Sequence, residues 1–458
     1  MPRTLRAALT ASILLGACLA SVEARANGRF PGATQLVLRG KSGAITTSFG
    51  VITTADDFAS THWVCETALG YEPQQNNELG AAVFPNGAIG ITGAFGLTVS
   101  SDFGCTNPKP AGPVGEYWMA DISVDEKDPT SGIAMSRGPN GSTCAAELFE
   151  TKDQGATWNP IGTKLPNGFC ALTIDSAPSD SQRIFVSGNI DRALDDGSLR
   201  QIGQLLVSDD RGKTWTAHDV PDENLPFIGA LDPIDRDTVW VRTLKGVDSG
   251  DLLVSRDAGK TFTKIATLTG KPLQFYGPTG LAVSPDGTKV AYGSLNEGLF
   301  VIEGKDGVPQ KRGDFPVMCL TWNADGLYAC STPSYCGPFF IGRSNDDGKT
   351  FTPILPTLDV HGDQTTCAPS TLVAKDCPQQ WATFKQRMRA CGEPEDAGGG
   401  APRDASSDVG GEPPLAPPPN IDCDCDTVAT SAARPYALPL VGLVAILALA
   451  RRKRRPRA

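Results

Sequence analysis

The segment Thr151-Lys-Asp-Gln-Gly-Ala-Thr-Trp158 decides the fold, because its pattern Ser/Thr-x-Asp-x-Gly-x-Thr-aromatic returns along the chain. The Asp side chain can accept hydrogen bonds from the amides of its own turn, and Gly supplies a positive φ. Thr and an aromatic residue suit the start of the outgoing strand. Each copy therefore predicts a tight β-hairpin. The full copies contain Asp153, Gly155 and Trp158; Asp210, Gly212 and Trp215; Asp257, Gly259 and Phe262; and Asp346, Gly348 and Phe351.

Weaker copies and the spacing give the number of repeats. Asp102 and Gly104 belong to a copy with Asn107 in place of the aromatic residue, and a more decayed copy starts at Thr54-x-Asp56. Most copies follow one another at roughly 50 residues, the length of one supersecondary unit. The last step is nearly twice as long, and a repeat without the motif, with its third strand at 298–302, fills it. We therefore expect seven repeats over 30–358, or six if the first copy forms something else.

The motif resembles the Asp-box, or BNR repeat, of the sialidase- and sortilin-like propeller superfamily. This resemblance implies that each copy is the turn between the third and fourth strands of a propeller blade. It implies an all-β, seven-bladed β-propeller, a fold whose radial repetition leaves only short sheet edges. We expect the propeller to be followed by a short disulfide-stapled helix, a disordered Pro/Gly stalk and a C-terminal hydrophobic helix.

Thirteen cysteines indicate an oxidising compartment if the chain is exported. Apart from Cys18, Cys423 and Cys425 they are even in number, so we expect them all to form disulfides. Cys319 and Cys330 flank a predicted hairpin turn, which makes a bridge across the two strands plausible. The pairs Cys65–Cys105 and Cys144–Cys170 would link neighbouring blades.

The last cysteines fall on a predicted helix. Apolar residues at helical spacing over 381–391 follow Asp376 and Pro378, which suit a helix start. Cys377 and Cys391 would lie too far apart along this helix to bond to each other. We expect them to pair among Cys336 and Cys367 and to hold the helix against the last blade.

The N-terminus predicts export. Arg3 and Arg6 precede an apolar run at 7–16, and Ala24-Arg25-Ala26 gives a small-residue cleavage site. This is the layout of a secretory signal peptide. The alternative is lipoprotein processing at Cys18, since Leu15-Gly16-Ala17-Cys18 resembles a lipobox.

The C-terminus predicts surface anchoring. A Pro- and Gly-rich stretch at 392–422 cannot bury enough surface to fold. It leads to Cys423 and Cys425, an apolar run at 436–450 and a cluster of Arg and Lys, which should stay cytoplasmic. This tail resembles MYXO-CTERM sorting tails, which implies processing by a myxosortase-like protease. An ordinary tail anchor is the alternative. The expected organisation is a signal peptide at 1–26, the propeller with its helix at 27–391, the stalk at 392–422, and the Cys motif, transmembrane helix and basic tail at 423–458.

Charge and composition exclude several classes of function. The net charge is −10, and both termini are basic, so the middle of the chain is more acidic still and disfavours nucleic acid as a partner. The chain has three His, which argues against a His-rich metal centre, and we expect neither metal nor cofactor. Fifty Gly and 36 Pro exclude a mostly helical protein.

The hypothesis we favour is a non-catalytic binding module for a glycan or protein ligand, displayed on the outer surface of a Gram-negative cell or released from it. Asp-box turns carry no chemistry, and no catalytic residue is assigned. The candidate binding loop is the insertion at 189–204, because long loops on rigid scaffolds often carry function. The alternative is an exo-acting, sialidase-like glycoside hydrolase, which would need a pair of carboxyl groups. The charged residues of the candidate loop are Asp191, Arg192, Asp195, Asp196 and Arg200.

Overall fold

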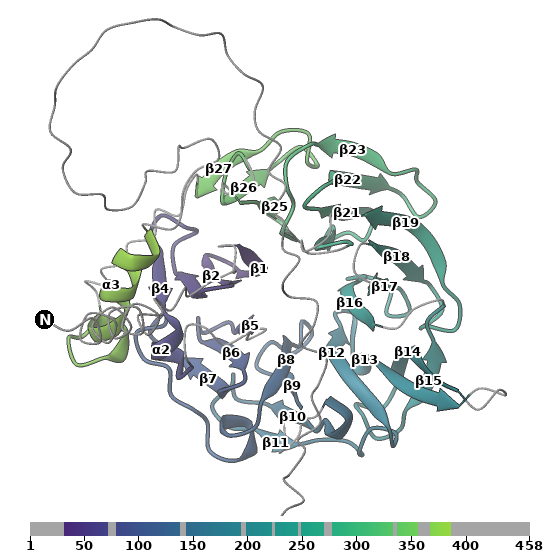
Figure 1. The fold of residues 1–458 in the computed structure, drawn as a ribbon, viewed down its shortest axis with the longest axis horizontal. Coiled ribbons are helices and arrows are strands. Elements are labelled where there is room, and N and C mark those ends of the chain that lie inside the picture. The colour runs from purple at the N-terminus through teal and green to yellow at the C-terminus, as the bar shows by residue number, and fades with distance from the viewer. Residues whose placement is uncertain are drawn as a thin grey trace, which may run out of the picture. The chain divides into compact units, whose positions relative to one another are not determined.

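The chain folds into a seven-bladed β-propeller. Seven antiparallel sheets, six of four strands and one of three, are each built from one continuous segment and form a ring in the computed structural model (Figure 1). The expectation of an all-β, seven-bladed propeller is confirmed, and the six-bladed alternative is wrong. The structure describes residues 32–71, 79–137, 143–193, 198–221, 225–245, 249–269, 277–332, 337–355 and 367–385.

The blades are numbered here in chain order. Blade 1 contains β1 (Ala33–Arg39), β2 (Ser42–Thr47), β3 (Gly50–Thr54) and β4 (His62–Val64); blade 2 contains β5 (Gly80–Val83), β6 (Ile89–Gly93) and β7 (Gly96–Ser100); blade 3 contains β8 (Met119–Val124), β9 (Gly132–Ser136), β10 (Leu148–Thr151) and β11 (Asn159–Pro160). Blade 4 contains β12 (Phe169–Ala177), β13 (Asp180–Ala193), β14 (Leu199–Ser208) and β15 (Thr216–Asp219); blade 5 contains β16 (Leu225–Leu231), β17 (Val239–Leu244), β18 (Ser249–Ser255) and β19 (Thr263–Thr269). Blade 6 contains β20 (Gly280–Val283), β21 (Lys289–Ser294), β22 (Gly298–Glu303) and β23 (Gln310–Gly313); blade 7 contains β24 (Cys319–Asn323), β25 (Gly326–Cys330), β26 (Ile341–Ser344) and β27 (Thr352–Leu355). The α-helices among the described residues are α2 (Glu66–Leu69) and α3 (Leu372–Lys385).

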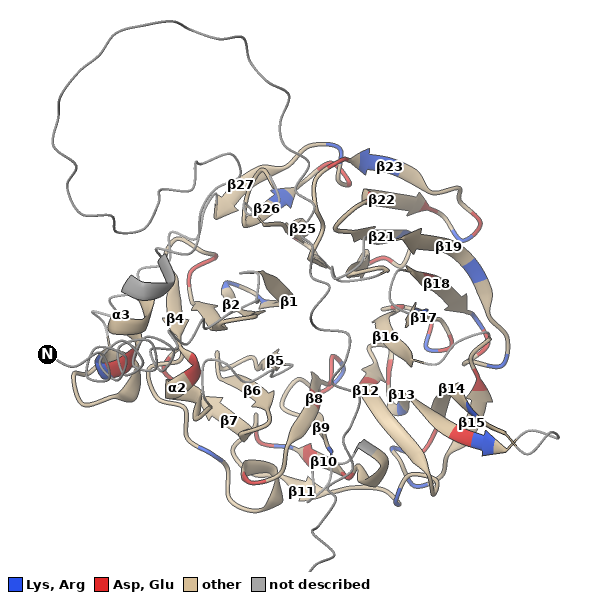
Figure 2. Ribbon diagram, viewed as in Figure 1, with Lys and Arg blue, Asp and Glu red and all other residues tan. Residues whose placement is uncertain are grey.

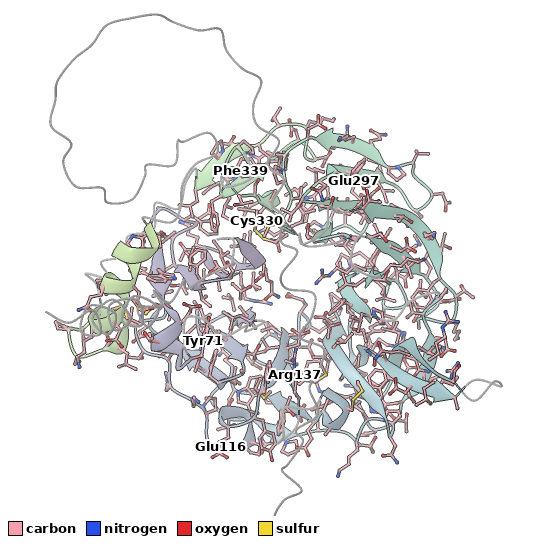
Figure 3. All side chains as sticks on the ribbon, viewed as in Figure 1. Tyr71, Glu116, Arg137, Glu297, Cys330 and Phe339 are labelled. Atoms are coloured by element: carbon pink, nitrogen blue, oxygen red, sulfur yellow. A yellow bond between two sulfur atoms is a disulfide. The ribbon has the colours of Figure 1, made fainter. Side chains whose placement is uncertain are left out.

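The hydrophobic core lies between blades. The strands β9 and β3, a second and a third strand of their blades, are buried at every position, because each blade packs on a neighbour through both faces. Side chains fill the spaces between successive blades in Figure 3. One cluster joins Phe84 of blade 2 to Phe149 and Trp158 of blade 3, and the largest joins blade 1 to blades 2 and 7 and to α3.

The repeated motif forms one hydrogen-bonded turn, which we call the Asp turn. In the copy at Asp153, the Thr151 hydroxyl donates to Asp153 Oδ1 (2.8 Å) and accepts from Gly155 N (2.9 Å). Thr157 N and Thr157 Oγ1 donate to the two carboxylate oxygens (2.8 and 2.6 Å). The turn needs two successive left-handed residues, Gln154 (φ 60°) and Gly155 (φ 88°). The same set of bonds is present at Asp56, Asp102, Asp210, Asp257 and Asp346.

The Asp turns lie where the motif placed them, at the end of the third strand of a blade. The strand expected at 298–302 is β22, the third strand of blade 6.

The copy at Thr54-x-Asp56 is less decayed than its sequence suggests, since Phe58 stands in the Gly position with φ 66° and still donates its amide to the Thr54 hydroxyl (2.9 Å). Blade 2 has three strands because Pro108, Pro110 and Pro113 follow its turn, and proline cannot donate to a sheet.

Two of the expected disulfides are present and one is wrong. Cys144–Cys170 and Cys319–Cys330 are confirmed, and Figure 3 shows Cys330 in the inner part of blade 7. Cys65 and Cys105 do not bond to each other. The observed bonds are Cys65–Cys377 and Cys105–Cys367, with sequence separations of 312 and 262 residues.

The C-terminal helix lies on the first blades and not on the last. The helix α3 begins at Leu372, because the Thr371 hydroxyl accepts a hydrogen bond from Ala374 N (3.2 Å), so Asp376 and Pro378 lie inside it. Cys377 bonds to Cys65 at the end of β4, and Trp381 packs on Trp63 with ring centroids 5.2 Å apart. Figure 1 shows α3 beside β4 and α2 at the rim. The expected partners of Cys377 were therefore wrong.

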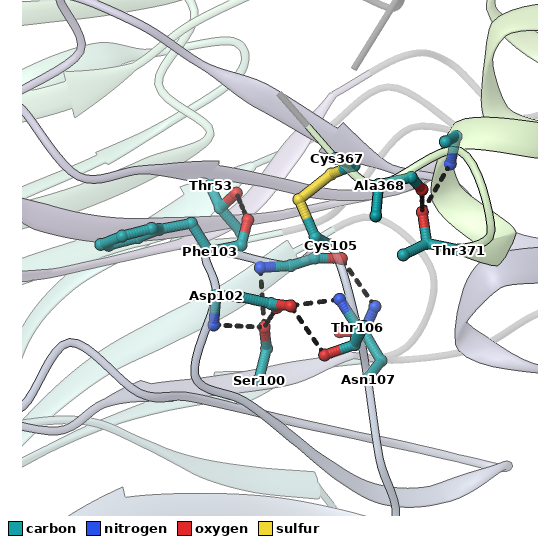
Figure 4. Close-up of a disulfide and its surroundings, with 12 residues drawn as sticks. Thr53, Ser100, Asp102, Phe103, Cys105, Thr106, Asn107, Cys367, Ala368 and Thr371 are labelled. Carbon is teal, nitrogen blue, oxygen red and sulfur yellow. Dashed lines mark hydrogen bonds between the residues drawn. A yellow bond between two sulfur atoms is a disulfide. The ribbon is translucent and has the colours of Figure 1, made fainter. Parts of the chain in front are cut away.

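Figure 4 shows the Cys105–Cys367 disulfide and its surroundings. Cys105 lies between Gly104 and Thr106 in the Asp turn of blade 2, so the turn that follows β7 also presents the Cys105 sulfur to Cys367. Every sheet is a continuous segment, so no strand is shared between blades 1 and 7. The two bonds add a covalent link from the segment after blade 7 back to the first two blades.

Several expectations fall on residues outside the described part of the chain. They are Cys336 and Cys391, the segment 1–26, the stalk at 392–422, Cys423, Cys425 and the apolar run at 436–450. Among the residues that are described, no helix has the length and hydropathy needed to cross a bilayer.

We expect Thr151→Val to lower the free energy of unfolding by about 1–3 kcal/mol, because it leaves the buried amide of Gly155 without an acceptor. The matched control is Thr98→Val, at a buried Thr whose hydroxyl has no hydrogen-bond partner among the described residues, and this change should be close to neutral. Denaturant unfolding of both variants measures the difference. Equal losses would contradict the role given to the Asp turn.

The two long-range disulfides close the same ring, so each should stabilise it less when the other is present. Once one bond is formed, the other closes only the short remaining loop. Replacing either cysteine pair by serines should therefore cost less free energy than the closure of the whole ring by a first bond contributes. We expect the four-serine variant to lose about 1–2 kcal/mol more than the sum of the two pairwise variants. Strict additivity in denaturant unfolding would show that they do not act on the same closure.

Candidate functional site

The innermost strands of four blades are irregular in the same way. In blades 1, 3, 4 and 5 a β-bulge interrupts the pairing of the first strand with the second. A bulge re-aims the side chain that follows it. The residues that follow are Gln35, Asp121, Thr173 and Ala230.

These re-aimed polar side chains connect successive blades. Each accepts a hydrogen bond from a backbone amide of the next blade: Gln35 Oε1 from Ala81 N (3.0 Å), Asp121 Oδ2 from Ile174 N (2.9 Å), and Thr173 Oγ1 from Ile228 N (2.9 Å). The ring closes with a side-chain-to-backbone bond of the opposite direction, in which Thr321 Oγ1 of blade 7 donates to Leu36 O of blade 1 (2.8 Å). Ala230 cannot make such a bond, and blade 5 meets blade 6 through Gly229 and Leu281 instead.

Two carboxyl groups lie close together on these strands. Asp121 is on β8 and Asp175 is on β12, and both side chains are half-buried. Burial raises the pKa of Asp121 to about 6. Burial, together with the charge of Asp121, raises the pKa of Asp175 to about 8 and outweighs a hydrogen bond with Ser123 that lowers it. Asp175 therefore holds a proton near neutral pH. In Figure 2 acidic residues lie beside β8 and on β12, near the centre of the ring.

A cavity of about 180 Å³ lies beside this pair, and we call it the axial cavity. It is lined by residues of β1, β5, β8 and β12, the innermost strands of blades 1 to 4, and of the turn after β8. Its polar lining includes Gln35, Arg39, Ser123, Glu126 and Asp175. Convergent polar groups and a perturbed carboxyl in a concave site are the usual marks of a binding site.

An ion pair lines one end of the axial cavity. Arg39 Nη2 lies 2.6 Å from Glu126 Oε1, and Arg39 Nε donates to Val83 O (3.0 Å). Glu126 is 53% exposed, so solvent reaches this end. Arg39 and Glu126 lie beside the turns between first and second strands. These turns lie on the face of the Asp turns, since Asp57 N donates to Lys41 O (2.9 Å) and Gln154 N to Thr130 O (2.8 Å).

The insertion at 189–204 forms the end of a long hairpin between β13 and β14. The two strands pair as far as Ala193 and Leu199, whereas β15 pairs with β14 only at 204–207. Residues 191–193 and 199–201 are exposed, and Leu199 is 72% exposed. The hairpin therefore extends beyond the rest of its sheet, on the opposite face from the Asp turns.

The charged residues of this hairpin differ in their contacts. Arg192 and Arg200 lie directly opposite each other, which is unfavourable for like charges. Arg192 is drawn to β15, where Arg192 Nη1 and Nη2 donate to Asp219 (2.7 and 2.9 Å), so it braces the hairpin. Asp191 and Arg200 are exposed. Asp195 and Asp196 lie outside the described residues.

Reasoning from the sequence missed the axial residues. Gln35, Asp121 and Asp175 stand in otherwise apolar first strands, such as Met119-Ala-Asp-Ile-Ser-Val124. An acidic residue inside an otherwise apolar strand was the indication of this site that the sequence offered. Which blade it faces depends on the bulge, which the hydrophobic pattern does not reveal.

Comparisons with known proteins give distant similarity alone. No family model matches the chain, and the curated proteins give no match. The chain is similar to the β-propeller domain of Cps50 (Swd1) from Myceliophteria thermophila, with a TM-score of 0.43 and 10% identity over 65% of this chain and 93% of that one. It is similar to YCF48 bound to D1 peptide, with a TM-score of 0.33 and 18% identity over 51% of this chain and 65% of that one. A third similar structure is the extracellular domain of BT4673 from B. thetaiotaomicron, with a TM-score of 0.42 and 12% identity over 66% of this chain and 37% of that one.

We expect Asp175→Asn to stabilise the protein more at alkaline than at acidic pH. A carboxyl whose pKa is raised by folding contributes fully to stability below its unfolded pKa, and this contribution is lost as the pH rises through about 8. The Asn variant removes that loss. The difference in Tm between variant and wild type should therefore become more positive from pH 5 to pH 9. A difference that stays flat would contradict the raised pKa of Asp175.

Proposed function

We propose that the chain is a non-catalytic binding module whose ligand is a glycan or a protein. The observation that carries this proposal is the β13–β14 hairpin. It is longer than its sheet requires, and it extends from a scaffold that is braced around it. Loops and hairpins held by a rigid scaffold are common sites of binding.

The exposed groups on the hairpin suit a polar ligand. Asp191 and Arg200 offer both charges, and Leu199 offers an apolar contact beside them. Arg192 is held by Asp219, which also accepts from Gln204 Nε2 (2.8 Å), so the root of the hairpin keeps one orientation. A preorganised surface loses less entropy on binding than a mobile loop.

The Asp turns supply the scaffold in this proposal. We assign them to the Asp-box, or BNR, repeat, because the Ser/Thr–Asp–amide bonds recur at six positions with the spacing of propeller blades. Hydrogen bonds from Thr214 lower the pKa of Asp210 to about 2, so this carboxylate stays ionised as an acceptor. The turns are structural and leave binding to the opposite face.

The ends of the chain supply the location in this proposal. The N-terminal segment would be removed as a signal peptide, and disulfides support an oxidising compartment. The stalk, the motif of Cys423 and Cys425, the apolar run and the basic tail would present the propeller at the outer cell surface after processing by a myxosortase-like protease. Mass spectrometry of the mature protein tests this, since intact residues at both ends would contradict it.

A glycoside hydrolase is the second candidate, because Asp121 and Asp175 form a carboxyl pair. However, the two oxygens of Asp121 accept from Ile122 N and Ile174 N (both 2.9 Å), so this carboxyl is used to join blades 3 and 4. Turnover of chromogenic glycosides that is lost in Asp175→Asn would replace the binding proposal with catalysis.

Shortening the hairpin tests the binding function. Asp191 and Gln201 are paired, so replacing 192–200 by Asn-Gly leaves a two-residue hairpin turn. We expect the variant to keep the wild-type Tm to within a few degrees and to lose binding on a glycan array or to a surface extract from the producing cells. The control replaces Lys305-Asp306, in the turn between β22 and β23 on the other face, by Asn-Gly. Binding that survives the first change, or is lost in both, would contradict the assignment.

A further inference from the structure

The lining of the axial cavity combines aliphatic groups with polar and charged ones. Val37, Val83 and Val124 line it together with Asp175. Among the described residues there is no cluster of three or more His, Cys, Asp or Glu side chains that could hold a metal ion. A chain of methylene groups that ends in a charged head matches both the valines and Asp175, as the stem and head of a lysine side chain do.

The charges around the cavity call for a cation. Asp121 and Asp175 repel each other when both are ionised. Arg39, the cation that lines the cavity, is held by Val83 O and by Glu126. An incoming ammonium group at Asp175 would take the place of the proton that this carboxyl holds near neutral pH, and the carboxylate would be left paired.

A buried hydroxyl lies on β6, near Asp121. Thr92 on β6 is fully buried, and its Oγ1 has no hydrogen-bond partner among the described residues. A Cβ at Gly80 would lie 2.6 Å from this oxygen and 3.5 Å from Asp121 Oδ1. The hydroxyl therefore packs directly against the Gly80 backbone, and Ala81 and Ile122, which follow Gly80 and Asp121 in their strands, line the cavity. Buried polar atoms usually have a partner, so Thr92 is a polar group that the described residues leave unsatisfied next to this lining.

The geometry points to the axial cavity as a binding site for a primary alkylammonium group, with its methylene stem along Val37 and Val83 and its ammonium at Asp175. A lysine side chain and a free alkylamine share this chemistry. The site goes beyond the proposed hairpin function, because it opens on the face of the Asp turns and uses none of the hairpin residues.

Binding at this site should depend on pH and release protons. The titratable and charged groups that face it are Asp175 of β12, Asp121 of β8, Arg39 of β1 and Glu126 after β8. The pKa of Asp175 is raised to about 8, so at pH 7 the ammonium must displace its proton. Affinity should rise from pH 6 to pH 9, while the amine, with a pKa of about 10.4, stays charged.

The test is isothermal titration calorimetry of the folded chain with Nα-acetyl-lysine N-methylamide. The matched probe is the norleucine analogue, which keeps the stem and lacks the ammonium, and n-butylamine separates a free amine from a peptide side chain. Titration in two buffers of different ionisation enthalpy counts the protons released at pH 7. The variants are Asp175→Asn, Val37→Phe to fill the cavity, and Asp306→Asn as an exposed control for the loss of one Asp charge.

We expect saturable binding of the lysine probe, no binding of the norleucine probe, and a loss of at least about tenfold in affinity in Asp175→Asn and Val37→Phe. Asp306→Asn and the hairpin-shortened variant should bind as wild type does, which separates this site from the hairpin. Equal binding of both probes, binding that survives Asp175→Asn in a protein with wild-type Tm, or no binding by the folded wild type at millimolar probe would overturn the inference.

Discussion

A Ser or Thr hydroxyl held between one carboxylate and one buried amide is the interaction on which this structure depends. In the Asp turn at Asp153, that hydroxyl fixes a turn with two successive left-handed residues, which is costly for any backbone that lacks such support. The turn then packs on the preceding blade, where a Cβ at Gly155 would come within 3.1 Å of the Phe84 ring. One local interaction, repeated six times, therefore sets both the hairpins and the contacts between blades.

Closing the ring is the second constraint. A propeller built from continuous sheets must join its first and last blades through side chains, here through a shared hydrophobic cluster, the bond from Thr321 to Leu36 and the two long-range disulfides. The segment that carries Cys367 and α3 returns to blades 1 and 2 and covers the outer edge strand β4. An exposed edge strand is a site for unwanted pairing, so this cover also protects the sheet.

The fold could be predicted from the sequence because its determinant is local: eight residues specify an Asp turn, and the spacing counts the blades. The copy at Asp56 shows the limit of this reading, since Thr54 and Asp56 keep the hydrogen bonds while Phe58 replaces the glycine. The pairing of Cys65 and Cys105 was wrong because it depends on where the chain goes after blade 7. The axial site was missed because bulges in the first strands decide which way Asp121 and Asp175 face, and the hydrophobic pattern carries no trace of them.

The two proposed sites lie on different faces of the ring, with the hairpin of the proposed function on one face and the axial cavity near the other. Both depend on a rigid frame, but the cavity adds an ionisable group that is kept protonated by burial and by a like charge. The most direct measurement of this state is the infrared C=O stretch of protonated carboxylic acids at pH 7, recorded as a difference between wild type and Asp175→Asn. We expect a band that is present in the wild type, absent in the variant and lost when n-butylamine is added. A wild-type spectrum without this band would contradict a protonated Asp175 and with it the account of the axial site.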